Sequence, residues 1–76
     1  MSNAQDIADQ LNAIEQAADE PGQNSTEIWA YVQTLPEYDE ARIDEVDPSG
    51  ASDRVPLKDG SLVRWDDQRK VWYAQS

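Results

Sequence analysis

The segment from Arg54 to Ala74 constrains the fold more than any other part of this 76-residue chain. It reads RVPLKDGSLVRWDDQRKVWYA, in which three short runs rich in Val, Leu, Trp and Tyr are separated by Asp59-Gly60 and Asp67-Gln68. Turn dipeptides between short apolar runs are typical of an antiparallel β-meander. The pattern therefore predicts three strands, at about 54–58, 61–66 and 69–74.

The same two turns predict how the strands pair. If each dipeptide forms a two-residue turn, Val55 lies opposite Arg64 and Val63 lies opposite Trp72. Because side chains alternate along a strand, this register divides the sheet into two apolar faces. One face is mainly aliphatic and carries Val55, Leu57, Leu62, Val71 and Tyr73, interrupted by Arg64. The other, the tryptophan face, carries Pro56, Val63, Trp65, Trp72 and Ala74.

Two helices are predicted before the meander, joined by a short loop as an antiparallel hairpin. The first, at about 4–19, follows from an apolar stripe at helical spacing and from the stop signal Pro21-Gly22. The second, at about 25–35, ends before Pro36, because the residue before a proline avoids the α region. Capping boxes are expected at Ser2–Gln5 and Asn24–Glu27. The two stripes consist of Ile7, Leu11, Ile14 and Ala18, and of Ile28, Val32 and Leu35.

Between the helices and the meander lies an acidic strap, residues 37–47, followed by a flexible loop to residue 53. The strap is compatible with irregular structure, one turn of helix, or a fourth, edge strand around 42–46. We expect one α+β domain spanning 1–76, in which the helical hairpin packs on the aliphatic sheet face. The tryptophan face is then covered by the strap, through Tyr38, Ile43 and Val46, or is left for a partner.

The composition removes most catalytic and metal chemistry. The chain has no Cys and no His, which excludes thiol nucleophiles, histidine-based triads and the usual zinc sites. Its three glycines form no phosphate-binding loop. Carboxylates surround the Pro-Ser-Gly loop without the EF-hand spacing; they are Asp44, Glu45, Asp47 and Asp53. We therefore expect a protein that is not an enzyme and that holds no cofactor and no metal.

Charge is the strongest compositional signal. Sixteen acidic residues stand against six basic ones, for a formal net charge of −10. Residues 1–53 contain thirteen of the carboxylates and one basic residue, Arg42. Such a surface disfavours direct binding to nucleic acid or to an anionic membrane and favours a basic partner. No secretory signal and no apolar run of roughly 18 residues is visible, so a soluble, cytoplasmic protein is expected.

These features predict an acidic protein-binding module. Carboxylates on one helix face recur about 5 to 6 Å apart, a spacing close to that of phosphates. The chain is thus a candidate nucleic-acid mimic that occupies the basic surface of a nucleic-acid-binding protein. In charge and size alone it is analogous to small acidic inhibitors of nucleases, restriction enzymes and CRISPR complexes. The expected partner-binding residues are Asp6, Asp9, Glu20, Glu37, Asp39, Glu40, Asp44, Glu45, Asp47, Trp65 and Trp72.

Two alternatives stay open on the sequence alone. If Trp65 and Trp72 are exposed, they are natural interface anchors, and the chain is a small adaptor or structural subunit that binds a partner or a second copy of itself. Alternatively, the acidity reflects a saline cytoplasm and carries no information about partners. Salt-dependent binding favours the acidic module, and tryptophans that can be replaced without unfolding favour the adaptor.

Overall fold

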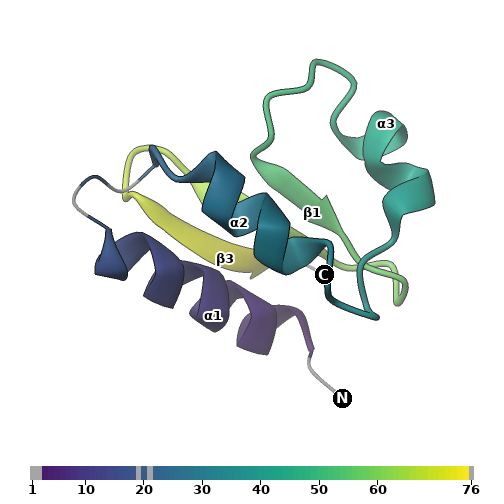
Figure 1. The fold of residues 1–76 in the computed structure, drawn as a ribbon. Coiled ribbons are helices and arrows are strands. Elements are labelled where there is room, and N and C mark those ends of the chain that lie inside the picture. Colours follow the sequence, from purple (N-terminus) through teal and green to yellow (C-terminus); the bar gives the residue numbers. More distant parts are fainter. Residues whose placement is uncertain (1–2, 19, 21, 76) are drawn as a thin grey trace.

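The computed structural model, which describes residues 3–18, 20 and 22–75, has helices in its first half and an antiparallel sheet in its second. Figure 1 shows α1 and α2 on one side of the sheet and α3 beside β1. The strands lie in the order β1-β2-β3, so the predicted α+β fold is confirmed. The elements are α1 (Ala4–Ala17), α2 (Ser25–Val32), the 3-10 turn η1 (Glu40–Arg42), α3 (Ile43–Val46), β1 (Arg54–Pro56), β2 (Leu62–Asp66) and β3 (Val71–Gln75).

A capping box begins α1, one residue later than the predicted pair. The Asp6 N–H donates to Asn3 Oδ1 at 2.9 Å, and the Asn3 N–H donates to Asp6 Oδ2 at 3.4 Å. The Asp6 carboxylate also lies at the positive end of the helix dipole, where negative charge is stabilising. The helix ends at Ala17. Residues 2, 19 and 21 of the predicted cap, helix end and stop signal lie outside the described residues.

Helix α2 is shorter than predicted, and its predicted capping box is wrong. The helix ends at Val32, and the residues that follow form turns, in which the Leu35 N–H donates to Val32 O at 3.0 Å. Asn24 occupies the N-cap position, but its side chain makes no cap hydrogen bond. Instead Asn24 Nδ2 donates back to Glu20 O at 2.8 Å. Asn24 therefore closes the loop between the helices.

The acidic strap forms one turn of 3-10 helix followed by one turn of α-helix, so the edge-strand alternative around 42–46 is wrong. An isolated antiparallel bridge joins Tyr38 to Leu57, just before these turns. The Asp39 N–H donates to Pro56 O at 3.0 Å, which fixes the strap along the outer edge of β1. Two guanidinium groups hold the remainder of the strap, residues 42–46, against β1 and the residue that follows it. Arg42 Nη1 donates to Leu57 O at 3.2 Å, and Arg54 Nη1 donates to Val46 O at 3.1 Å.

The first hairpin differs from the predicted register by one residue. Its loop holds three residues, 58–60, and is closed by the Leu57 N–H, which donates to Ser61 O at 3.0 Å. Gly60 ends the loop with φ +93, the left-handed conformation that three-residue hairpin loops require. As a result, Val55 lies opposite Val63 instead of Arg64.

The second hairpin differs from the predicted register by two residues. Its loop runs over 67–70, because the Lys70 N–H donates to Asp66 O at 2.7 Å and Lys70 takes up φ +58. Trp65 therefore lies opposite Trp72, and the predicted pairing of Val63 with Trp72 is wrong.

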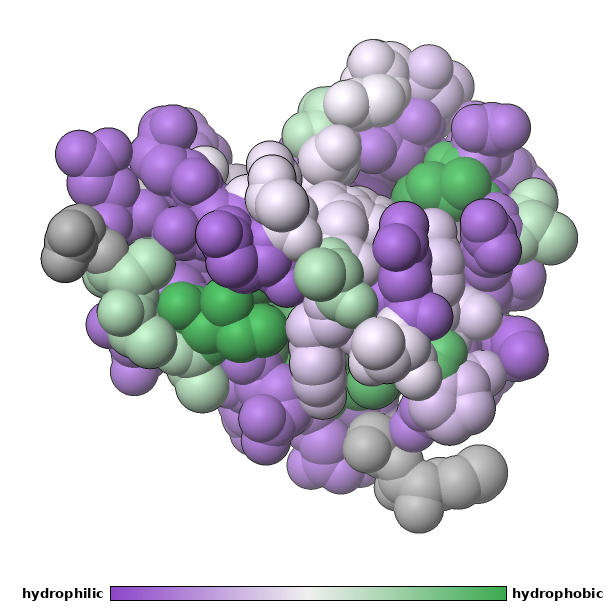
Figure 2. All heavy atoms as spheres, in the orientation of Figure 1, coloured by the Kyte–Doolittle hydropathy of each residue, from purple (hydrophilic) through white to green (hydrophobic). Residues whose placement is uncertain are grey.

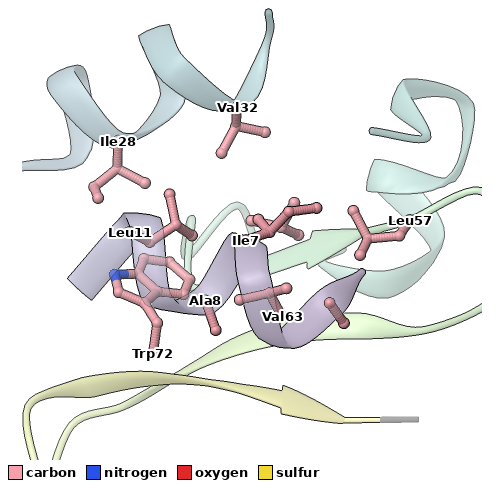
Figure 3. Packing of buried hydrophobic residues seen from close by; sticks show 10 residues of the cluster. Ile7, Ala8, Leu11, Ile28, Val32, Leu57, Val63 and Trp72 are labelled. Atoms are coloured by element: carbon pink, nitrogen blue, oxygen red, sulfur yellow. The ribbon is translucent and has the colours of Figure 1, made fainter. Parts of the chain in front are cut away.

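These two shifts place the apolar side chains of the sheet mainly on one face. A shift of one residue moves Val55 and Leu57 to the tryptophan face, whereas a shift of two leaves Trp65 and Trp72 together. The helices cover this face, so the expectation that they pack on a separate aliphatic face was wrong. Figure 3 shows the helix and sheet side chains meeting in one cluster. Its buried members are Ala4, Ile7, Ala8, Leu11, Ile28, Val32, Val55, Leu57, Val63 and Trp72.

Helix α1 also covers the free edge of β3. Asn12 Nδ2 donates to Trp72 O at 3.0 Å, and the Trp72 N–H donates to Asn12 Oδ1 at 2.7 Å. One side chain thus satisfies both outward-facing backbone groups of Trp72. Unpaired backbone groups on an edge strand are a template for pairing with another chain, so Asn12 both anchors α1 and protects the edge.

Candidate functional site

The structure divides the predicted acidic residues between two surfaces. Asp6, Asp9 and Glu20 are exposed on and just after α1. The strap carries the rest, at the opposite side of the molecule, where α3 lies beside β1 (Figure 1). On the face drawn in Figure 2, hydrophilic residues cover most of the surface and hydrophobic residues form small separate groups. The two acidic groups thus belong to different elements, α1 and the strap.

The strap carries the denser group of exposed charge. Glu40, Asp44 and Glu45 are exposed, while Glu37 and Asp39 are half-buried. Within the ranges 3–18, 20 and 22–75, a single ion pair is present, between Lys70 Nζ and Asp67 Oδ1 at 2.8 Å. The exposed strap carboxylates thus lie outside any ion pair of the described residues.

The strap carboxylates affect the pKa of Tyr38. Burial raises the pKa of the Tyr38 phenol, and the nearby carboxylates raise it further, because each makes a second negative charge less favourable. In order of effect these carboxylates are Glu40, Asp39 and Asp44. The strap is therefore a region of negative potential around a largely apolar side chain.

Asp47, one of the predicted partner-binding residues, is buried and holds the backbone of a loop. It is 6 % exposed, and its carboxylate accepts hydrogen bonds from the backbone N–H groups of Ala51 at 3.1 Å and Ser52 at 2.8 Å. These bonds hold the loop that leads into β1. Among the described residues no group of three or more carboxylates is placed to hold a metal ion.

Both tryptophans of the predicted site belong to the helix-covered face. Trp72 is 6 % exposed and Trp65 is half-buried, and their ring centroids lie 5.6 Å apart at an interplanar angle of 58°. Trp65 Nε1 donates to Asp67 Oδ1 at 3.3 Å. An open tryptophan platform, which the adaptor alternative requires, is absent from the described sheet.

The same tryptophans line a pocket that the sequence did not predict. Its volume is about 250 Å³, and it lies where the end of α1, the start of α2 and the loop before β1 meet β2 and β3. It is lined by Glu15, Gly22, Ser25, Ile28, Ala51, Ser52, Asp53, Trp65 and Trp72.

Glu15 is the least expected of these residues, because it is a carboxylate that is only 3 % exposed. Its Oε2 accepts a short hydrogen bond from the Gly22 N–H and a longer one, at 3.5 Å, from Asn24 Nδ2. Gly22 has φ +88, and a Cβ there would lie 3.2 Å from Cζ2 of Trp65, so this position favours glycine. A signal in the sequence was present: Glu15 stands four residues after Leu11, on the apolar stripe of the helix.

Two further polar atoms of the pocket-lining residues are closed to solvent and have no hydrogen-bond partner. They are Asp53 Oδ1 and Trp72 Nε1. Figure 3 shows the Trp72 ring nitrogen on the side of the ring toward Ile28, another lining residue. Buried polar groups are nearly always paired, so these two atoms are unusual among the buried polar atoms of the described residues.

Comparison with family models, with curated proteins and with solved structures finds no match to this chain. The description of its class therefore comes from the fold and the surfaces alone. It is a small, acidic α+β domain, and no described helix is both long enough and apolar enough to cross a membrane.

Proposed function

We propose that this chain is a non-enzymatic, acidic protein-binding module whose strap docks on a basic surface of a partner protein. The single observation that carries the proposal is the row of exposed strap carboxylates outside any ion pair of the described residues. Uncompensated charge of one sign raises the rate of encounter with a surface of the other sign and selects against acidic partners.

The strap is better suited to this role than the acidic residues of α1. Its backbone is bonded on both sides of the bridge, to β1 and to the loop that follows β1: the Asp39 N–H donates to Pro56 O, and the Lys58 N–H donates to Glu37 O at 2.9 Å. A charged segment that is already ordered loses less conformational entropy on binding than a flexible one. On α1, by contrast, Asp6 is engaged in the capping box.

A surface that binds nucleic acid is the natural class of target. Such surfaces are built to neutralise closely spaced negative charges, and they bind polyanions with a strong dependence on salt. The adaptor alternative receives less support, because Trp72 is buried beneath the helices. Replacing it is expected to unfold the domain before it reveals any interface.

Two triple variants test the proposal at equal net charge. The strap-neutral variant carries Glu40→Gln, Asp44→Asn and Glu45→Gln; the helix-neutral variant carries Asp9→Asn, Glu20→Gln and Glu27→Gln. Each raises the formal net charge from −10 by three, to −7. Proteins retained from a host lysate at ~0.05 M salt should be released at ~0.5 M salt, where the Debye length is only a few ångströms. Added duplex DNA should compete for the same partner.

The comparison of the two variants decides the location of the interface. The strap-neutral variant should lose the partner, and the helix-neutral variant should retain it. Equal losses from both variants would show that only net charge matters, and retention at ~0.5 M salt would remove the electrostatic basis of the proposal.

A further inference from the structure

We propose that the pocket between α1, α2 and the sheet binds the guanidinium group of an arginine residue or of a small arginine-like molecule. In this arrangement the guanidinium lies against the carboxylates of Glu15 and Asp53 and the rings of Trp65 and Trp72, all of which line the pocket. This site has no residue in common with the strap, and the inference does not depend on docking of the strap.

The charge of the pocket favours a cation. Its described lining includes two carboxylates, Glu15 and Asp53, and no basic residue. Asp53 Oδ1 has no hydrogen-bond donor, and the two described bonds of Glu15 both end on Oε2. Buried carboxylates are costly unless a donor or a counter-charge accompanies them, and the fork of donors on a guanidinium matches carboxylates from two sides.

The aromatic residues favour guanidinium over ammonium. Trp65 and Trp72 both line the pocket, and their rings are tilted by 58° to each other. A guanidinium is planar and weakly hydrated, so it stacks on an aromatic face at little desolvation cost. An ammonium is a compact and strongly hydrated charge, which gains less from such a wall.

The size of the pocket suits the side chain of an arginine. The pocket volume of 250 Å³ corresponds to about eight water molecules at roughly 30 Å³ each, enough for a ligand of this size.

The indole signals of the intact protein in ¹⁵N-resolved NMR provide the readout. Titration with argininamide should shift the Trp72 indole signal with a saturable dependence on concentration. The Trp29 ring does not line the pocket, but its Nε1 donates to Ser52 O of the lining, so its indole signal should shift less than that of Trp72. Citrullinamide has the same shape with a neutral urea in place of the guanidinium, and it should not give a saturable shift.

Variants locate the binding groups. Glu15→Gln and Asp53→Asn should each weaken argininamide binding by about tenfold or more, as expected for loss of a charge-assisted hydrogen bond. Glu27→Gln, on the exposed face of α2, should leave it unchanged. If Glu15→Gln proves unfolded by its amide spectrum, Asp53→Asn carries the test.

An acetylated and amidated Gly-Arg-Gly peptide separates the two sources of the ligand. Binding as tight as that of argininamide assigns the site to an arginine displayed by another protein, and exclusion of the peptide assigns it to a free small molecule. The proposal is overturned if argininamide gives no saturable shift, or if citrullinamide binds equally well. The pocket would then hold water alone.

Discussion

At the scale of one residue, the charge of the strap affects the pKa of Tyr38. Its ring packs edge-on against Trp29, with ring centroids 5.9 Å apart, while three carboxylates of the strap act on its phenol. Burial is the larger cause of its raised pKa, and the carboxylates add to it. The two causes respond differently to salt, because salt screens charges but does not change burial.

The Tyr38 phenol should titrate above its ordinary value of 10.0, and salt should reverse only part of the shift. Since the folded-state pKa is the higher one, folding is favoured below the unfolded value, and this stability is lost as the pH rises through the folded-state pKa. Tyrosinate absorbance, taken as the difference between the wild type and Tyr38→Phe, measures it.

The two triple variants supply the control for this titration. The strap-neutral variant should bring the Tyr38 pKa closer to its ordinary value, because it removes two of the three carboxylates that act on the phenol. The helix-neutral variant should leave the pKa of Tyr38 unchanged. A pKa that is the same in all three proteins would mean that burial alone raises it.

At the scale of elements, one side chain, Asn12, makes the described hydrogen bonds between α1 and β3. Asn12 bonds both backbone groups of Trp72, so Asn12→Ala leaves an N–H and a C=O without partners at a half-buried site. The expected loss in the free energy of unfolding is about 1–3 kcal/mol, measured by urea unfolding with tryptophan fluorescence. Gln16→Ala, an exposed position one turn later on the same helix, should cost far less. Both substitutions introduce the residue of highest helix propensity, so equal costs would show that the two bonds to Trp72 do not account for the loss.

The elements themselves could be predicted from the sequence, whereas their register could not. Apolar stripes and turn dipeptides placed the helices and strands correctly within a few residues. The register depends on how many residues each loop contains, and this is decided by backbone conformation at the end of the loop. Gly60 signals a left-handed residue, but Lys70 adopts φ +58 without any such signal. The one-residue difference in the first hairpin placed the side chains of β1 on the opposite face of the sheet from the predicted one.

The candidate pocket was missed for a related reason. Glu15, Asp53 and Trp72 come from three separate parts of the chain, and only the true register brings them to the same side of the sheet. The strap carboxylates were found because they lie within eleven consecutive residues, 37–47. Sequence patterns thus located the local cluster of charge, whereas a site assembled from distant residues required the fold.

For the whole molecule, the small size of the domain keeps its many negative charges close to one another. The Cα radius of gyration is 11.3 Å, which is close to the Debye length of about 10 Å at 0.1 M salt. Carboxylates on the same side of the domain therefore repel one another at low salt, and few basic residues offset them. A chain this small also buries only about 60 % of its unfolded surface, so its margin of stability is narrow.

Sodium chloride should therefore stabilise the folded state. Between ~0.05 M and ~0.5 M the free energy of unfolding should rise by about 1 kcal/mol, because screening weakens repulsion more in the compact state than in the expanded chain. Chloride is preferred to sulfate, which stabilises proteins by exclusion from their surfaces whatever their charge. The strap-neutral variant, at −7 instead of −10, should gain less from salt and should be more stable than the wild type at ~0.05 M. If salt lowers or leaves unchanged the stability of the wild type, the strap carboxylates are already compensated, and both the repulsion inferred here and the docking surface proposed for the strap lose their basis.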